Sequence, residues 1–523
     1  MHKSGFTRII CVVALSCLTG AISLRAQTYR SLASFDPSIG QYPVSPLVQG
    51  LNGNYYGVAI GGGSNFGCGW GSSVDCGTFF EVTPAGKLTV LYNFCALANC
   101  ADGGLPEPAL ALGPDGNFYG STYTGGANNM YPPCQFGAAG CGTIFKITPT
   151  GQLTTLYNLC SEFNCADGAY PDRLALGADG NFYGTTESGG IFNGDAGCPN
   201  GCGTVFKISP AGQFTSLYKF CSTTDINGNC TDGIIPASGM IQATNGNFYG
   251  TTLYGGTSGW GNIFQITPSG VLTSMYSFCS QTNCADGGLA PNEPFILGAD
   301  GNLYSTTYSR GVNGGGTFFR FTPKGQLTTL YSFCFSLKTP CPDGSSPHGS
   351  LAQGSDGNFY GATYSGGNTS PALCGGVGFG CGTLFQITPT GQLSTLYRFC
   401  PNSNCIAGAY AQGVMQGTNG VIYGATTYGG DSEWGVIFGA TNKLSPFVQA
   451  LPNVGKTGRV IDILGNNLAG TTSVTFNGAS ASFQVVSNTY LKARVPSGAT
   501  TGQIKVTTPT GTLTSNVAFQ VLP

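Results

Sequence analysis

The sequence carries very little charge, because Asp, Glu, Lys and Arg make up only 8% of its residues, against about a quarter in ordinary globular proteins. Without residues 1–26, which hold three bases and no acid, 17 of the 20 bases face 22 acids, a formal charge of −5. The chain has no basic clusters, which argues against a nucleic-acid-binding role. No segment shows the 3.6-residue apolar period of a helix, so we expect an all-β fold.

Long apolar runs are also missing after the N-terminus. Basic residues precede a short apolar stretch at residues 9–18, and small residues follow as far as Ala26. This order is typical of a secretory signal peptide, and the stretch is too short for a comfortable membrane span. We expect residues 1–26 to be removed, no transmembrane segment, and a secreted, periplasmic or cell-surface location. A lipidated Cys17 stays open as an alternative, although the residues before it fit a lipidation box poorly.

Repetition is what the chain has in abundance. An aromatic-rich GN-x-YG core, with one residue changed in the fifth and in the seventh copy, recurs seven times between residues 27 and 440, at intervals of 55 to 66 residues. Its marker glycines are Gly53, Gly116, Gly180, Gly246, Gly301, Gly357 and Gly420. A period of this size indicates stacked or ringed units that bury their apolar faces against one another.

Each repeat is expected to form four short strands. In the second repeat, residues 110–113 and 117–122 flank an Asp-Gly turn, and residues 143–147 and 153–157 flank a Pro-x-Gly turn. Four antiparallel strands repeated radially predict a seven-bladed β-propeller. Residues 29–35 resemble the fourth strand of a repeat but precede the first complete unit. We expect this strand to complete the last blade and so remove an exposed sheet edge.

The cysteines form close pairs. Twenty of the 22 lie after residue 26, and repeats that lack one member of a pair also lack the other. This pattern favours local disulfide bonds in an exported protein. The pairs are Cys68/Cys76, Cys95/Cys100, Cys134/Cys141, Cys160/Cys165, Cys198/Cys202, Cys221/Cys230, Cys279/Cys284, Cys334/Cys341, Cys374/Cys381 and Cys400/Cys405. A zinc site would need two pairs to converge, and these loops offer no histidine, so no metal site is expected.

Several motifs connect the repeats to a known family. DGNFYG occurs at Asp115–Gly120 and Asp179–Gly184, GTIFKITPTGQLTTLYNLC spans Gly142–Cys160, and CADG recurs. Through these motifs the chain resembles the GloVer family of bacterial exported tandem-repeat proteins, over about four-fifths of its length. The resemblance implies a place at the cell exterior and a variable C-terminal module. It implies no common activity.

Beyond residue 444 the cysteines stop. Short strands alternate with glycine turns, as in Val460–Leu468 and Val474–Gly478. This part resembles an IPT/TIG domain, an immunoglobulin-like β-sandwich. The resemblance implies a spacer or adhesion module without catalytic residues. The expected organisation is a signal peptide at 1–26, a β-propeller at 27–443 and the IPT/TIG sandwich at 444–523.

Strand order places all the cysteine pairs on one face of the expected propeller, and tight turns on the other. Long braced loops on a rigid scaffold are where binding usually resides. Trp70, Trp260 and Trp434 all lie in these loops, where exposed indoles would suit stacking on sugar rings. Trp260 and Trp434 stand where other repeats have a second cysteine, so packing as loop filler is the favoured alternative.

The repeats differ from one another just before their first strands, at the mouth of the expected channel. The residues there are Glu107, Asp172, Arg173, Glu293, His348 and Gln412. Three carboxyl groups and an imidazole would suit acid/base chemistry on a polysaccharide, which makes Glu107, Asp172, Glu293 and His348 the candidate catalytic groups of an enzyme. Arg173 and Gln412 are candidate ligand-binding residues. Ordinary loop drift explains the same variation.

An aspartate before glycine recurs in five repeats, at Asp102, Asp167, Asp232, Asp286 and Asp343. A ring of carboxylates would suit calcium, but Asp-Gly is itself a turn signature and one carboxylate per blade is dispersed. No cofactor is therefore expected, and calcium stays an alternative. The favoured function is a monomeric, exported, non-enzymatic protein that binds a polysaccharide or another surface protein. The alternative is a polysaccharide hydrolase or lyase acting at the channel mouth.

Overall fold

The computed structural model describes residues 28–522 apart from 45, 69–74, 129–133, 135–139, 195–196, 289–293, 335–340, 368–373, 375–379 and 402–403. The expected signal peptide lies outside this part. Regular structure in the described residues is strand, apart from three short 3-10 helices, η1 (Ala98–Cys100), η2 (Phe163–Cys165) and η3 (Thr282–Cys284). The expected all-β class is therefore confirmed. In the same residues, no helix has the length and apolar character that a membrane crossing needs.

The repeats form four-stranded antiparallel sheets, in which the first strand is split in two in the first three repeats. The strands of those repeats are β2 (Gln41–Pro43), β3 (Val48–Gln49), β4 (Tyr55–Gly61), β5 (Thr78–Val82) and β6 (Leu88–Asn93); β7 (Gly104–Pro106), β8 (Ala111–Leu112), β9 (Phe118–Thr124), β10 (Thr143–Ile147) and β11 (Leu153–Asn158); and β12 (Ala169–Pro171), β13 (Ala175–Leu176), β14 (Phe182–Ser188), β15 (Thr204–Ile208) and β16 (Phe214–Lys219).

The later repeats follow the same order. Their strands are β17 (Met240–Gln242), β18 (Phe248–Thr251), β19 (Asn262–Ile266) and β20 (Leu272–Ser277); β21 (Ile296–Leu297), β22 (Leu303–Thr307), β23 (Thr317–Phe321) and β24 (Leu327–Ser332); β25 (Ser345–Gln353), β26 (Phe359–Ser365), β27 (Thr383–Ile387) and β28 (Leu393–Arg398); and β29 (Ala409–Gln416), β30 (Ile422–Tyr428) and β31 (Val436–Thr441). A parallel bridge between Ser350 and Gly413 joins the sixth and seventh sheets.

The DGNFYG motif forms the turn and the second strand of its sheet. Asp115 accepts hydrogen bonds from the Asn117 side chain at 2.7 Å and from the Tyr119 hydroxyl at 2.8 Å, which holds the turn against the strand. Gly120 lies under the ring of Phe145, and a Cβ there would come within 2.7 Å of the Phe145 Cζ. The glycine after the tyrosine is therefore required by the close approach of the ring on the neighbouring strand.

Buried aromatic pairs join each sheet to the next. Tyr119 of the second repeat stacks on Phe182 of the third with 4.0 Å between ring centroids, and Tyr183 stacks on Phe248 at the same distance. Such pairs contribute about 0.5–1.5 kcal/mol each beyond the area they bury. The main apolar core therefore lies between neighbouring sheets.

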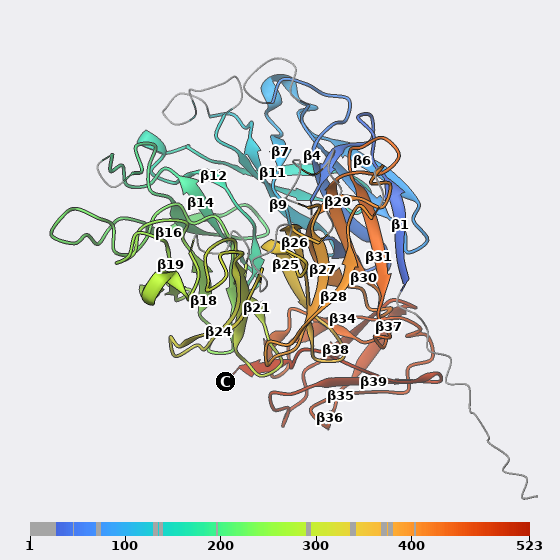
Figure 1. The fold of residues 1–523 in the computed structure, drawn as a ribbon. Coiled ribbons are helices and arrows are strands. Elements are labelled where there is room, and N and C mark those ends of the chain that lie inside the picture. Colours follow the sequence, from blue (N-terminus) through green and yellow to red (C-terminus); the bar gives the residue numbers. More distant parts are fainter. Residues whose placement is uncertain are drawn as a thin grey trace, which may run out of the picture.

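The first and last repeats also contact each other. β1 (Thr28–Ser34) pairs antiparallel with β31 (Figure 1). Tyr423 of the seventh repeat lies 4.1 Å from Tyr55 of the first, ring to ring. The Tyr42 N–H donates to the Trp434 carbonyl at 3.2 Å, as the Tyr170 N–H does to the Cys141 carbonyl between the second and third repeats. The contacts that link consecutive repeats therefore recur between the seventh and the first.

The C-terminal domain is a small β-sandwich. One sheet has the order β32-β34-β38-β37, the other has the order β36-β35-β39-β40, and β33 pairs with β41. Its strands are β32 (Gln449–Leu451), β33 (Val454–Lys456), β34 (Val460–Leu464), β35 (Ser473–Phe476), β36 (Ala479–Ser480), β37 (Phe483–Ser487), β38 (Tyr490–Arg494), β39 (Ile504–Thr508), β40 (Gly511–Thr514) and β41 (Gln520–Leu522). Ile461 and Leu491 of one sheet pack with Val474 and Val506 of the other in a shared apolar core.

Candidate functional site

The C-terminal domain rests on the tight-turn ends of the repeat sheets, where the red strands of Figure 1 lie below the others. The Thr489 hydroxyl donates to the Leu51 carbonyl at 2.7 Å, and the Asn516 side chain donates to the Gln353 carbonyl at 2.8 Å. The two acceptors belong to the first and sixth repeats. The domain therefore contacts several repeats at their turn ends, and the loop ends of the sheets, which we call the loop face, lie on the opposite side (Figure 1).

An apolar cavity of about 470 Å³ lies between the first strands of the repeats and the C-terminal domain. Leu110, Leu351 and Val414 line it from the repeats, and Phe447 and Leu464 line it from the C-terminal domain. Its remaining lining is mainly aliphatic with several amide and hydroxyl side chains, and none of its lining side chains is titratable, so it offers no acid/base group.

One arginine joins two repeats that are far apart in the sequence. Arg173, from the third repeat, donates to the Ser350 hydroxyl of the sixth repeat at 3.3 Å, and both residues are buried. Its Nε also lies 4.0 Å from the Asp172 carboxylate. Arg173, a candidate ligand-binding residue from the sequence, thus makes contacts that tie the two repeats together.

Acidic side chains gather at this point. Glu107 of the second repeat, Asp172 of the third, and Glu187 at the end of β14 influence one another electrostatically. Burial, then the charges of Asp172 and Glu187, hold the pKa of the Glu107 carboxyl well above its usual range, and the Arg173 guanidinium opposes this. Burial and the Asp172 charge raise the pKa of Glu187 to about 7, against a lowering hydrogen bond from Tyr123. Carboxyl groups that are partly protonated near neutral pH are typical of functional sites.

A second cluster on the loop face is aromatic. Tyr42 of the first repeat lies 5.3 Å from both Tyr428 and Trp434 of the seventh, ring centroid to centroid, and roughly perpendicular to each. These three rings line a pocket of about 200 Å³ together with Asn404 and Glu433. We call this group the aromatic pocket. It combines apolar ring surface with an amide and a carboxylate.

The aromatic pocket continues into a row of rings along the neighbouring repeats. Tyr428 lies 5.7 Å from Tyr410, which stacks on Tyr364 at 4.5 Å. His348 follows at 5.9 Å from Tyr364 and 6.2 Å from Tyr308. The structure therefore places the His348 ring beside the rings of Tyr308 and Tyr364.

The remaining candidates from the sequence fall into three groups. Trp70 and Glu293 lie outside the described residues. Gln412 donates to the Thr427 hydroxyl at 2.6 Å, a contact within the seventh repeat. Trp260 packs against the core beneath Arg310, whose guanidinium carbon lies 4.5 Å from the ring centroid. These contacts favour the filler role for Trp260, whereas Trp434 lines the aromatic pocket.

The aspartates before glycine hold their own loops. Asp102 is fully buried and accepts hydrogen bonds from the Tyr92 hydroxyl at 2.7 Å and from the backbone N–H of Ala96 at 2.8 Å. Asp343 makes the same two kinds of contact with Tyr331 and with the backbone N–H of Cys334. The geometry supports the turn role, because each carboxylate already accepts hydrogen bonds from its own repeat.

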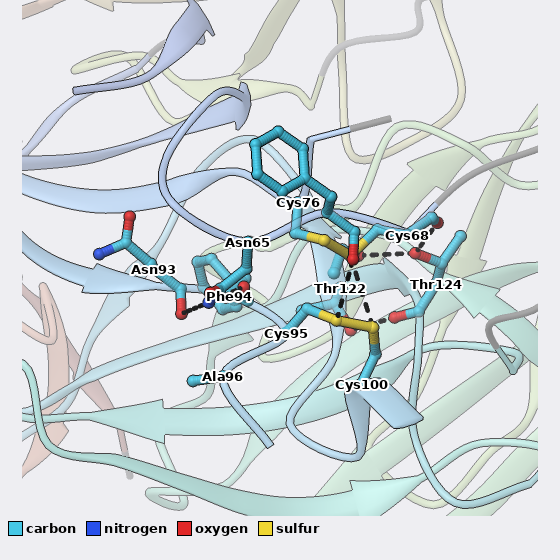
Figure 2. The surroundings of a disulfide bond; sticks show 12 residues. Asn65, Cys68, Cys76, Asn93, Phe94, Cys95, Ala96, Cys100, Thr122 and Thr124 are labelled. Atoms are coloured by element: carbon cyan, nitrogen blue, oxygen red, sulfur yellow. Dashed lines mark hydrogen bonds between the residues drawn. A yellow bond between two sulfur atoms is a disulfide. The ribbon is translucent and has the colours of Figure 1, made fainter. Parts of the chain in front are cut away.

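Ten disulfide bonds brace the loop face, and each joins two cysteines 4 to 9 residues apart, in the ten pairs named above. Figure 2 shows two of them in the first repeat, where the Asn65 side chain also donates to the Phe94 carbonyl at 2.9 Å. The bridges and side-chain hydrogen bonds together restrain loops that carry little regular structure.

Reasoning from the sequence missed Glu187 and Tyr42, Tyr364, Tyr410 and Tyr428. Glu187 occupies the position that is Tyr123 in the second repeat, five residues after the phenylalanine of the FYG motif. The residue before the proline of the first strand also differs from repeat to repeat: it is Tyr42 before Pro43 in the first repeat and Leu105 before Pro106 in the second. Aligning the repeats at these two positions, rather than at the segment after the proline, would have found Glu187, Tyr42, Tyr364 and Tyr410, whereas Tyr428 lies one residue further along its strand.

Comparison with known families accounts for almost the whole chain. A model of the Gloeobacter/Verrucomicrobia repeat matches residues 20–193, 68–278 and 197–438, which overlap and together span well over half of the chain. The chain belongs to the Gloeobacter/Verrucomicrobia repeat family. The C-terminal domain matches the IPT/TIG domain over residues 446–521. Both resemblances expected from the sequence are thus confirmed.

Other comparisons add little about this member of the repeat family. Comparison with curated proteins gives no match. A luciferin-regenerating enzyme is 13% identical, with a TM-score of 0.36, over 81% of this chain and 98% of its own. An auxiliary nutrient binding protein from Bacteroides ovatus is 11% identical, with a TM-score of 0.38, over 80% of this chain and 76% of its own. At these values the likeness carries no functional argument.

Proposed function

We propose that the repeats close into a seven-bladed β-propeller, in which the N-terminal strand β1 completes the last blade. The pairing of β1 with β31 supports this closure. So does the Tyr55–Tyr423 ring contact, because it repeats the Tyr119–Phe182 contact between two consecutive repeats. In this arrangement residues 27–443 form the propeller, and residues 444–523 form the IPT/TIG domain below it.

The proposed function of this propeller is exported, non-enzymatic binding of carbohydrate at the loop face. One observation carries the proposal: Tyr42, Tyr428 and Trp434 bring three rings together around a pocket of about 200 Å³. The apolar faces of aromatic rings suit the C–H faces of a pyranose, and the Asn404 amide and the Glu433 carboxylate supply the polar contacts that fix its orientation. The row from Tyr410 to Tyr308 would extend the surface along a longer chain.

Export accounts for the number of bridges. Ten disulfide bonds among the described residues are typical of an oxidising compartment outside the cytoplasm. In the proposed arrangement the IPT/TIG domain acts as a spacer or contact module on the turn face, and the loop face points away from it.

The second candidate is a polysaccharide hydrolase or lyase that uses the acidic cluster. The observation in its favour is the carboxyl of Glu187, whose pKa of about 7 suits proton transfer near neutral pH. Asp172 and Glu107 lie within its electrostatic reach. A carboxylate pair in which one group is protonated and the other is ionised is what glycoside cleavage requires.

Purified chain tested against a panel of plant and microbial polysaccharides separates the two. Binding is read by calorimetry, and cleavage by the release of reducing or unsaturated ends. The binding proposal expects affinity without turnover, and at least a tenfold loss of affinity in Trp434→Ala. Trp260→Ala, which removes an equally large side chain from the equivalent loop position of the fourth repeat, is the matched control and should bind normally. Turnover abolished by Glu187→Gln would establish the enzyme instead.

A further inference from the structure

The two disulfide bonds of a single repeat lie against each other. In the first repeat Cys68 and Cys76 come from the loop after β4, and Cys95 and Cys100 come from the segment after β6 (Figure 2). All four sulfur atoms lie within 4.8 Å of one another. The Sγ atoms of Cys68 and Cys100, which belong to different bridges, are 3.7 Å apart. We call this group a four-sulfur cluster.

The same cluster recurs in the second and sixth repeats, and the third repeat, which also has both pairs, brings three sulfurs together. In the second repeat the Sγ atoms of Cys134 and Cys165, again from different bridges, are 3.8 Å apart. The cysteines of the sixth repeat also bring four sulfurs within 4.8 Å of one another, and those of the third repeat bring three. The members of these clusters are Cys134, Cys141, Cys160 and Cys165; Cys374, Cys381, Cys400 and Cys405; and Cys198, Cys202 and Cys230.

These distances match a tetrahedral thiolate site. A Zn²⁺ ion bound by four thiolates has Zn–S distances of about 2.3 Å, so its sulfur atoms are about 3.8 Å apart along each edge of the tetrahedron. The distances of 3.7 and 3.8 Å between the bridges already have this value. One edge of each cluster therefore already has the length that a bound ion requires, and the two bonded sulfurs of each bridge would separate to this length once the bridge is opened.

Burial strengthens the match. Three of the four cysteines in the first repeat and all four in the second and sixth are buried. A Cβ on Gly104 would come within 2.4 Å of the Cys68 Sγ, so the surrounding backbone packs closely around the sulfurs. Structural Cys₄ zinc sites share these properties, being closed to solvent and formed by two short cysteine pairs.

We propose that each four-sulfur cluster is a redox-gated site for a thiophilic divalent ion of tetrahedral preference, with Zn²⁺ as the example. Oxidised, the cluster holds two disulfide bonds and no ion. A two-electron reductant, a dithiol or a phosphine, opens each bridge; two bridges take up four electrons and four protons and give four thiols. Binding of the ion then releases the four protons and leaves a tetrathiolate complex.

Repeats with a single cysteine pair have too few thiols for such a site. Cys279 and Cys284 of the fourth repeat and Cys334 and Cys341 of the fifth have no second pair beside them in the sequence. They form bridges all the same. A bridge therefore needs no partner bridge, and two thiols do not complete a tetrahedral site, so these repeats serve as internal controls.

The test is titration of the full chain with Co²⁺ under argon, with and without a non-chelating phosphine reductant. Tetrahedral cobalt thiolate is recognised by its charge-transfer and d–d absorption bands. The reduced chain should take up three equivalents with these bands, one for each four-sulfur cluster, and the three-sulfur cluster should bind more weakly. The oxidised chain should take up none. Zn²⁺ should displace the cobalt and remove the bands.

Variants assign the sites. Cys68→Ser combined with Cys76→Ser should reduce the uptake from three equivalents to two, whereas Cys279→Ser combined with Cys284→Ser should leave it at three. Circular dichroism with and without Co²⁺ follows the fold in each case. The proposal fails if the reduced chain shows no charge-transfer band, if both double variants lose the same amount, or if the reduced chain unfolds and stays metal-free.

Discussion

The side chain of Gln49 in the first repeat makes two hydrogen bonds to Thr418 in the seventh. Its amide oxygen accepts from the Thr418 backbone N–H at 3.0 Å, and its amide nitrogen donates to the Thr418 hydroxyl at 3.0 Å. Gln242 makes the first of these contacts with the backbone N–H of Ala178 one repeat earlier, at 2.8 Å. A link that joins consecutive repeats thus also joins the two ends of the repeat array.

Gln49→Ala should destabilise the chain by about 1–3 kcal/mol, because it leaves a buried N–H and a hydroxyl without their partner. Gln242→Ala is the matched control and should cost a similar amount. Urea denaturation of the three proteins measures both. If Gln242→Ala is destabilising and Gln49→Ala is neutral, the contact between the first and last repeats contributes nothing and the closed propeller loses its support.

Glu187→Gln should change how stability depends on pH. The folded pKa of Glu187 is about 7, against an ordinary value of 4.5, so the folded chain binds more protons than the unfolded chain between these values. The stability contributed by this group is therefore complete below pH 4.5 and is lost as the pH rises to 7. The variant should match the parent at pH 4 and exceed it at pH 8, by on the order of 1–3 kcal/mol.

Thermal unfolding at several pH values measures this difference. Glu162→Gln is the control, because it removes an exposed carboxyl from the segment after β11 of the second repeat. This carboxyl lies away from the acidic cluster, so the variant should leave the pH profile unchanged. If both variants change the pH dependence of stability equally, the change reflects the loss of one negative charge from the chain and not the burial of Glu187 beside Asp172.

Thr489→Lys should uncouple the IPT/TIG domain from the repeats. The Thr489 hydroxyl donates to the Leu51 carbonyl, and a Cβ on Gly53 would already approach the Thr489 methyl to 2.8 Å, so a longer charged side chain does not fit. Calorimetry should show two separate transitions in place of a shared one. Thr512→Lys, on an exposed part of the same domain, is the control. A single unchanged transition in Thr489→Lys would mean that this contact does not hold the domain.

Cys279→Ser combined with Cys284→Ser should cost about 2 kcal/mol, because the bridge closes a loop of only a few residues. The remaining repeats should keep their fold, since each bridge is local. Urea denaturation gives the cost. Peptide mapping without reductant tests the pairing itself, and a link between cysteines of different repeats would contradict the local scheme.

Much of the fold followed from local chemistry. Asp115, Asn117 and Tyr119 bond within one turn and strand, and Gly120 is needed where the Phe145 ring approaches. Such short-range requirements leave a visible motif, which is why the repeats and the all-β class were predictable. The site was predictable only in part. Glu107 and Asp172 were identified, but Glu187 sits at the end of a strand where its spacing gives no sign of what it faces.

The sequence alone determined the repeat unit, the close pairing of the cysteines and the change of domain near residue 444, because each depends on residues that are neighbours along the chain. The tertiary structure decided which residues from distant repeats meet. Tyr42 reaches Tyr428 and Trp434 only because the sheets of the first and seventh repeats pack side by side. The two bridges of the first repeat meet because the loop after β4 lies beside the segment after β6 (Figure 2). Contacts across hundreds of residues depend on how the sheets are arranged in space, and no local pattern encodes that.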